Sequence, residues 1–373
     1  MKVETSDEAT RLHGRLPLIP YLIFFSIVGI PALFYSARIN KVIWGLVWLV
    51  FVVFIGLRHE VGGDWEGYLL ITERIAHASL LDTGKNQEFL FSLLTWCSTH
   101  LGMGVYGANL VGAVVFCTGL FAFCARLPNR WLALAAATPF LVVVAVMSAN
   151  RQGIAIGIVL LVLSKWERLS LLRRTGGILV AGLFHTSAIL LLVLSIADLQ
   201  ISRTKKIVLM LIAGAAVIWL VSRSEAAWYR YTTIYVQQSA GAYSPGAIFH
   251  LLLNLIPAVV MLVFHRRWSS VVESWLLLRQ LCWMAVALFF LAPFFTVAVG
   301  RMSLYLFPIS ISFMAYLPQM VKASAGRALV RTACVVLLGT VMWTWLTFAN
   351  TAFTYLPYKS VLMIRSSELS LPR

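Results

Sequence analysis

Long apolar runs separated by short polar segments recur along the whole chain. Most of these runs approach the roughly 20 residues that a helix needs to cross a ~30 Å hydrocarbon core. Because a helix satisfies its own backbone hydrogen bonds in lipid, runs of this length indicate transmembrane helices. The pattern predicts an all-α integral membrane protein with about ten transmembrane helices, in which residues 1–373 form a single polytopic domain. The predicted spans are 17–36, 41–57, 105–125, 131–148, 151–165, 205–221, 246–265, 276–298, 301–320 and 329–349.

Two apolar segments do not fit a simple crossing. Residues 88–101 are short and partly polar, which is typical of an interfacial or half-inserted helix. Residues 176–197 are long enough to cross, but basic clusters flank both of their ends. The polar triplet His185-Thr186-Ser187 at the centre predicts a re-entrant pair, because such backbone is tolerated where it lines a cavity inside the protein.

Composition agrees with a membrane location, with 60% hydrophobic and 12% charged residues. The net charge of +16 resides in short Lys and Arg clusters between the apolar runs, a positive-inside pattern. We therefore expect a lipid bilayer as a partner and no nucleic acid. The five cysteines lie in apolar stretches without CxxC or nearby His spacing, so neither a metal nor a disulfide is expected. The clusters that set the topology are 165–174, 203–206, 266–267 and 322–331.

Placing these clusters in the cytoplasm puts both termini outside, with 58–104 as an external loop containing interfacial helices. Residues 222–245 form a second external loop, whose aromatic residues are either an interfacial belt or a platform for sugar rings. This arrangement gathers Arg58, Asp64, Arg151 and Arg301 at one face. A rival arrangement places the amino terminus and the 58–88 loop inside, with 88–101 crossing fully.

Candidate chemistry is concentrated after the second apolar run. Six carboxylates lie between Arg58 and Glu88, in a chain that holds only 14 Asp and Glu residues. This enrichment indicates either a site or a solvated loop. Arg58, Arg151 and Arg301 adjoin apolar runs, where a guanidinium needs a partner or water. They either reach lipid headgroups or bind a phosphate or pyrophosphate through bidentate donors.

Three further residues are candidates for proton transfer. Asp64 and Glu60 flank a flexible Val61-Gly62-Gly63 step and would act either as a general base or, for Asp64, as a helix cap. His185 would be either a packing group or a donor to a phosphate or carboxylate. The chain contains no GxxxxGK, GxSxG or HExxH motif, so nucleotide hydrolysis, esterase and zinc-protease activities gain no support.

A series of short motifs runs in order along the chain. The series begins with Gly56-Leu57-Arg58, Val61-Gly62, Asp64 and Tyr68. It continues with Glu88-Phe89-Leu90-Phe91, Arg151-Gln152, Ala155, Phe184-His185, Ser187-Ala188, Arg301, Tyr305 and Pro357-Tyr358. In residue type and order this series resembles the EpsG family, the Wzy-like polymerases of bacterial exopolysaccharides and O-antigen, over nearly the whole chain. Phe89 stands where the family pattern has a proline, and the amino-terminal extension through Arg15 is longer than the usual family start.

The resemblance implies a membrane glycosyltransferase of the C-type fold in the bacterial cytoplasmic membrane, with its site facing outward. Such an enzyme polymerises oligosaccharide repeat units linked to undecaprenyl pyrophosphate. A transporter or flippase of lipid-linked saccharides, or an O-antigen-type ligase, is the alternative. Lipid-linked oligosaccharide is the expected substrate, and chain-length regulators or export proteins are candidate partners.

The resemblance also implies roles for individual residues. Arg58, Arg151 and Arg301 would bind the pyrophosphate with help from His185, and Asp64 would activate the acceptor, with Glu60 and Glu88 as weaker candidates. The other expected substrate-binding residues are Gln152, Tyr305, Tyr68 and Tyr358. No cofactor or metal is expected, although a divalent cation between Asp64 and the pyrophosphate stays open.

Overall fold

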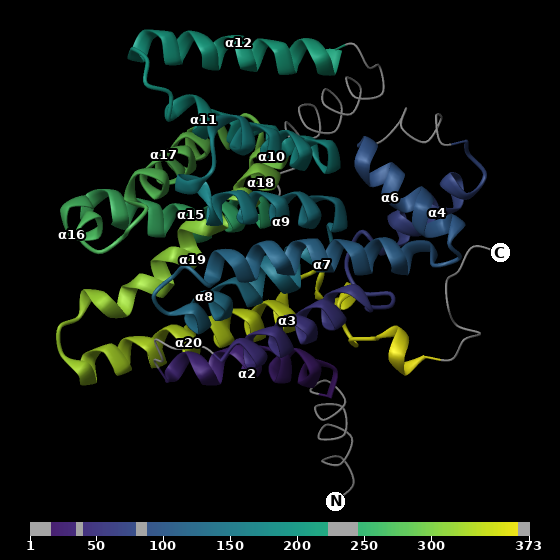
Figure 1. The fold of residues 1–373 in the computed structure, drawn as a ribbon. Helices are drawn as coiled ribbons and strands as arrows, with labels where there is room; N and C mark the ends of the chain where they lie inside the picture. Colours follow the sequence, from purple (N-terminus) through teal and green to yellow (C-terminus); the bar gives the residue numbers. More distant parts are fainter. Residues whose placement is uncertain (1–15, 35–39, 80–87, 223–244, 365–373) are drawn as a thin grey trace, which may run out of the picture.

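The chain folds into a bundle of helices, many of which run roughly along one common direction (Figure 1). The computed structural model describes residues 16–34, 40–79, 88–222 and 245–364, and no β-strand occurs within them. The first half contains α2 (Ile19–Leu33), α3 (Lys41–Gly56), α4 (Trp65–Ala76), α6 (Phe89–His100), α7 (Gly104–Cys124), α8 (Arg130–Ala137), the π-helical η2 (Thr138–Val146) and α9 (Asn150–Ser164). The second half contains η3 (Trp166–Arg168), α10 (Leu171–Phe184), η4 (Thr186–Leu191), α11 (Leu192–Ala197), α12 (Arg203–Ser222), α15 (Pro245–Val263), α16 (His265–Ser269), α17 (Trp275–Leu291), α18 (Thr296–Ser303), η6 (Leu304–Leu306), α19 (Phe307–Tyr316), η7 (Leu317–Met320) and α20 (Ser324–Phe348).

Three helical stretches of the described chain are long and apolar enough to cross a membrane: Gly104–Cys124, Thr296–Met320 and Ser324–Phe348. Seven further apolar helices of 10–17 residues accompany them. The all-helical architecture and the apolar helices agree with a membrane protein, while the number of spans stays a prediction. The expected external loop at 222–245 lies almost wholly outside the described residues.

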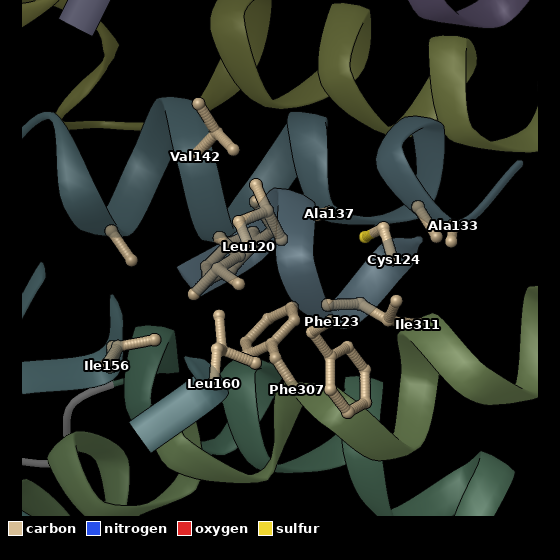
Figure 2. Close-up of a cluster of buried hydrophobic side chains, with 14 of the residues drawn as sticks. Leu120, Phe123, Cys124, Ala133, Ala137, Val142, Ile156, Leu160, Phe307 and Ile311 are labelled. Atoms are coloured by element: carbon tan, nitrogen blue, oxygen red, sulfur yellow. The ribbon is translucent and has the colours of Figure 1, made fainter. Parts of the chain in front are cut away.

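The centre of the bundle is a continuous apolar core. Figure 2 shows side chains of α7, α8, η2, α9 and α19 interlocking there, including Leu120, Leu160 and Phe307. All three are buried. Helices that carry apolar residues on every side, such as α7, pack on several faces at once, which explains the absence of an amphipathic pattern in their sequence.

The tightest helix crossing joins α7 and α9. A Cβ added at Gly157 would overlap the backbone of Phe116, and one added at Gly119 would overlap the carbonyl group of Gly157. Small residues at such a crossing let two helices approach to backbone contact, which is the main source of association energy in lipid. The crossing fixes the position of α9, whose first turn carries Arg151 and Gln152.

The segment 176–197 does not continue as one helix but reverses at His185. α10 ends at Phe184, His185 is extended (φ −154°, ψ 116°), and η4 then leads back into α11. Arg174 near the start of α10 forms an ion pair with Asp198 just after α11, at 2.7 Å. Trp166 and Gln280 also donate hydrogen bonds to that carboxylate. The start of α10 and the end of α11 therefore lie together, and the polar turn at His185 lies at the opposite end of the bundle.

The two ends of the bundle differ in chemistry. At the end where α10 begins, arginines donate to carbonyl groups at helix ends: Arg126 to Ser164, Arg267 to Met320 and Arg331 to Leu33. At the other end α4 and α6 lie together (Figure 1). That second end carries Glu88, Arg151 and His185.

Candidate active site

Glu88 joins three parts of the chain that are far apart in sequence. It precedes α6, and its Oε2 lies 2.9 Å from Nη1 of Arg151 in the first turn of α9. Its Oε1 lies 3.0 Å from Nδ1 of His185 at the turn of the hairpin. The Glu88 side chain is only 10% exposed, so both contacts lie largely out of water.

The environment of Glu88 keeps this carboxyl group ionised. Burial alone raises the pKa of Glu88, but the hydrogen bond from His185 and the charge of Arg151 outweigh it and lower the pKa to about 2. An ionised Glu88 accepts two charge-assisted or strongly polar hydrogen bonds at once. It thereby fixes the orientation of both the guanidinium and the imidazole.

Arg151 is held from several directions. Its guanidinium carbon lies 5.9 Å from the ring centre of Tyr68 and 5.8 Å from that of Phe91. The backbone N–H of Arg151 donates to the Tyr68 hydroxyl at 3.3 Å. These aromatic contacts and the Glu88 ion pair hold a side chain that remains 22% exposed, so it can still reach a ligand.

His185 presents its two ring nitrogens to different partners. Since Nδ1 faces the Glu88 carboxylate, it carries the ring proton, and this assigns the acceptor role to Nε2. Nε2 lies 3.2 Å from the hydroxyl oxygen of Ser187, two residues further along η4. Carboxylate, imidazole and hydroxyl thus form a continuous chain, the arrangement in which a histidine accepts a proton from an adjacent hydroxyl group.

Arg301 stands beside this cluster on α18. Its carbonyl oxygen accepts a hydrogen bond from the buried Gln152 amide at 2.5 Å, which ties α18 to α9 next to Arg151. The Arg301 side chain is exposed, and its positive charge, like that of Arg151, acts on His185. The structure therefore brings Glu88, Arg151, Gln152, His185 and Arg301 together, with Tyr68 beneath Arg151.

Arg58 is placed differently from Arg151 and Arg301. It is 1% exposed and donates to the carbonyl oxygens of Ile55 and Val61 and to Oδ1 of Asn109. Burial is the largest influence on Arg58 and lowers its pKa to about 10. These contacts brace the turn after α3, so Arg58 supports the backbone near the site. Its expected contact with pyrophosphate stays a prediction.

Glu60 and Asp64, the two carboxylates expected to act as a base, lie outside the cluster formed by Glu88, Arg151 and His185. Glu60 has a left-handed backbone (φ +53°) and forms an ion pair with Lys359, whose hydrogen bond holds the pKa of Glu60 below its ordinary value. Asp64 is exposed at the start of α4 and caps no N–H group of that helix, although Asp was a candidate cap there. Neither carboxylate contacts Glu88 or His185 in the described structure.

The remaining two expected ligand residues lie inside the protein. Tyr305 is 1% exposed in η6. Tyr358 stacks on Phe54 with ring centres 4.2 Å apart and donates to the Phe54 carbonyl oxygen at 2.9 Å. Tyr358 thus attaches the last part of the described chain, residues 349–364, to α3. Its expected part in substrate binding stays a prediction.

The family model of the EpsG family matches residues 41–360, which span all of the residues just described. The chain belongs to the EpsG family. No curated protein and no solved structure matches it. Membership of the EpsG family associates the chain with exopolysaccharide polymerisation and, together with the apolar helices, with a membrane.

Sequence reasoning missed part of this EpsG-family site. Ser187 and Phe91 were noted only within motifs, yet Ser187 contacts His185 and Phe91 lies under Arg151. The signal for Ser187 was its spacing of two residues from a histidine at a helix break. Among the described residues no group of three or more His, Cys, Asp or Glu side chains is arranged to hold a metal ion.

Proposed function

We propose that this protein is a membrane glycosyltransferase that polymerises lipid-linked oligosaccharide repeat units into exopolysaccharide or O-antigen. The observation that carries the proposal is the contact of Glu88 with both Arg151 and His185, beside Arg301. Membership of the EpsG family supports the class of reaction. The donor we propose is a growing glycan on undecaprenyl pyrophosphate, and the acceptor is an incoming repeat unit on the same lipid.

In the proposed reaction, an acceptor hydroxyl oxygen attacks C1 of the donor sugar that is bonded to pyrophosphate. The new glycosidic C–O bond forms while the C1–O bond to pyrophosphate breaks, and the electron pair leaves with the pyrophosphate lipid. Arg151 and Arg301 bind that pyrophosphate and stabilise the charge that develops on it. Guanidinium groups suit this role because they stay charged and donate in pairs to phosphate oxygens.

His185 accepts the proton of the attacking hydroxyl at Nε2, and the ionised Glu88 stabilises the imidazolium that results. The Ser187 hydroxyl oxygen, 3.2 Å from Nε2, indicates where the acceptor hydroxyl would approach His185. This assignment moves the base from Asp64 to His185, because His185 is oriented by a buried carboxylate and Asp64 is exposed. Asp64 at the edge of the site remains a candidate for contacts with the acceptor sugar.

The test uses purified protein, a defined undecaprenyl-pyrophosphate-linked repeat unit and a gel that resolves product length. Arg151→Ala and Arg301→Ala should each lower the rate about 10²–10³-fold, the usual effect of removing one charge-stabilising donor. Arg173→Ala is the matched control, because Arg173 is an exposed arginine near the start of α10, at the opposite end of the bundle. Normal polymer from both site variants would overturn the proposal. Substrate left unextended by folded wild-type protein would favour transport or ligation.

We also propose that the site faces outward from the cytoplasmic membrane, because the basic clusters at the other end follow the positive-inside rule. A reporter fused after Ile75 tests this orientation. An external signal is expected, and a cytoplasmic signal would place the site on the wrong side for lipid-linked repeat units delivered to the outer face.

A further inference from the structure

A cavity lies at the basic end of the bundle, far from Glu88. It has a volume of about 310 Å³ and opens between the start of α8, the end of α19 with η7, and the first turns of α20. This volume is within the ~300–1,000 Å³ range of small-ligand sites. Its lining is Asn129, Ala315, Pro318, Gln319, Ser324, Arg327 and Arg331, a set that contains two cations and no acidic residue.

The two arginines are placed as an unneutralised pair. Arg327 and Arg331 are four residues apart on α20 and therefore lie on the same face of that helix. Arg331 donates its Nε–H to the carbonyl oxygen of Leu33, and within the described chain neither arginine contacts a carboxylate. Like charges at this spacing destabilise a helix, and an anion between them removes that penalty.

The beginning of α20 adds to the positive potential of the cavity. The residue before the helix is Ala323, which supplies no side-chain cap, and the first turn contains no acidic residue. The N–H groups of that turn therefore lack a side-chain acceptor within the helix end itself, and the helix dipole adds a partial positive charge. By contrast, Asn129 caps α8 by accepting from the Leu132 N–H. The uncapped end and the arginine pair border the same cavity.

One helix that lines the cavity, α20, is apolar and largely exposed. Within the most apolar stretch of α20 only 22% of the residues are buried, whereas 67% are buried in the corresponding stretch of α7. Leu329, between the two arginines in sequence, and Val336 and Leu337, farther along α20, are exposed. Because α20 both lines the cavity and exposes apolar side chains, the hydrocarbon chains of a molecule whose phosphate group occupies the cavity can pack along that helix.

We propose that this cavity binds a phosphate monoester or diester, and that an anionic phospholipid headgroup is its source. Basic pockets between transmembrane helices are suited to such headgroups, because they combine guanidinium donors with an adjacent apolar surface. The proposal is independent of the reaction proposed above, since it uses no residue of the Glu88 cluster.

The probe is phosphatidylglycerol added to the full-length protein in detergent, with retained lipid counted by native mass spectrometry. Wild-type protein should retain phosphatidylglycerol in preference to phosphatidylcholine, and Arg327→Gln should weaken that binding about fivefold. Arg168→Gln in η3 is the matched control, because Arg168 is another exposed arginine outside the cavity. It should change binding less than twofold.

Gln319→Glu is a second variant that places a negative charge in the cavity without removing an arginine, and it should weaken binding as Arg327→Gln does. Competition with inorganic phosphate distinguishes the two sources of the ligand. Displacement of the lipid by millimolar phosphate would assign the site to a soluble phosphate compound, and no displacement would assign it to a lipid headgroup. Equal binding by wild type and both cavity variants, or an equal loss in Arg168→Gln, would overturn the proposal.

Discussion

Glu88→Gln is the most informative change in this protein, because it keeps the size of the side chain and removes only its charge. Glu88 pairs with Arg151 at 2.9 Å and with His185 at 3.0 Å in a setting that is 10% exposed. A neutral amide can accept from only one side and offers an N–H₂ group to the other. Arg151 is then left without its counter-charge, and the imidazole loses the partner that fixes its tautomer.

The size of the effect follows from the protonation equilibrium of Glu88. Lowering its pKa from 4.5 to about 2 means that the folded protein stabilises the ionised form, relative to the protonated form, by about 3 kcal/mol more than water does. Because Arg151 is partly exposed and regains water, we expect a smaller loss of about 1–3 kcal/mol in unfolding free energy. The catalytic rate should fall about 10²–10⁴-fold, which is the range attributed to a positioned general base.

The assay compares polymerisation rates and thermal unfolding of Glu88→Gln with those of Glu73→Gln, an exposed carboxylate on α4. The control should match the wild type in both measurements. The stabilising effect of Glu88 should be complete above pH 4.5 and should disappear as the pH falls toward about 2, because the folded-state pKa is lowered. A Glu88→Gln enzyme with wild-type rate and stability would refute the role given to this carboxylate.

Three other changes test the scaffold. Gly157→Leu should lower the unfolding free energy by more than about 2 kcal/mol in thermal melts, because any side chain there overlaps α7, whereas Gly176→Ala has open space and should be neutral or stabilising. Arg58→Lys should lose about 2 kcal/mol of stability while the KM for lipid-linked substrate stays unchanged; a raised KM with normal stability would return Arg58 to the pyrophosphate. Asp198→Asn should lower the melting temperature by weakening the closure of the α10–α11 hairpin, with no change in rate per folded molecule.

The sequence predicted the helical segments well, because apolar runs determine where helices lie in such a chain. The predicted span 151–165, for example, corresponds to α9 at Asn150–Ser164. It did not predict the π-helix at Thr138–Val146 within the predicted span 131–148. Pro139 lacks a backbone N–H and disturbs the hydrogen-bond register there, but whether a helix then kinks or widens depends on its neighbours.

The site was predicted less completely than the helices. The local excess of carboxylates drew attention to residues 58–88, yet only Glu88 among those described contacts both Arg151 and His185. Those contacts span 63 and 97 residues of sequence, and no local pattern encodes them. The burial of Arg58 was equally unforeseeable, because it depends on Asn109 of α7 and on carbonyl groups that the turn after α3 exposes.

The break at His185 connects the fold to the proposed chemistry. An unbroken helix over 176–197 would point its polar residues at lipid or core, whereas the reversal brings His185 to the end of the bundle where α6 and α9 supply Glu88 and Arg151. Together Glu88, Arg151 and Arg301 carry one excess positive charge when His185 is neutral. A pyrophosphate therefore enters a site that is already positive. It can bind Arg301 while Glu88 keeps its contact with His185. Glu88 can therefore orient the base, His185, throughout the reaction, while the arginines stabilise the charge on the leaving group.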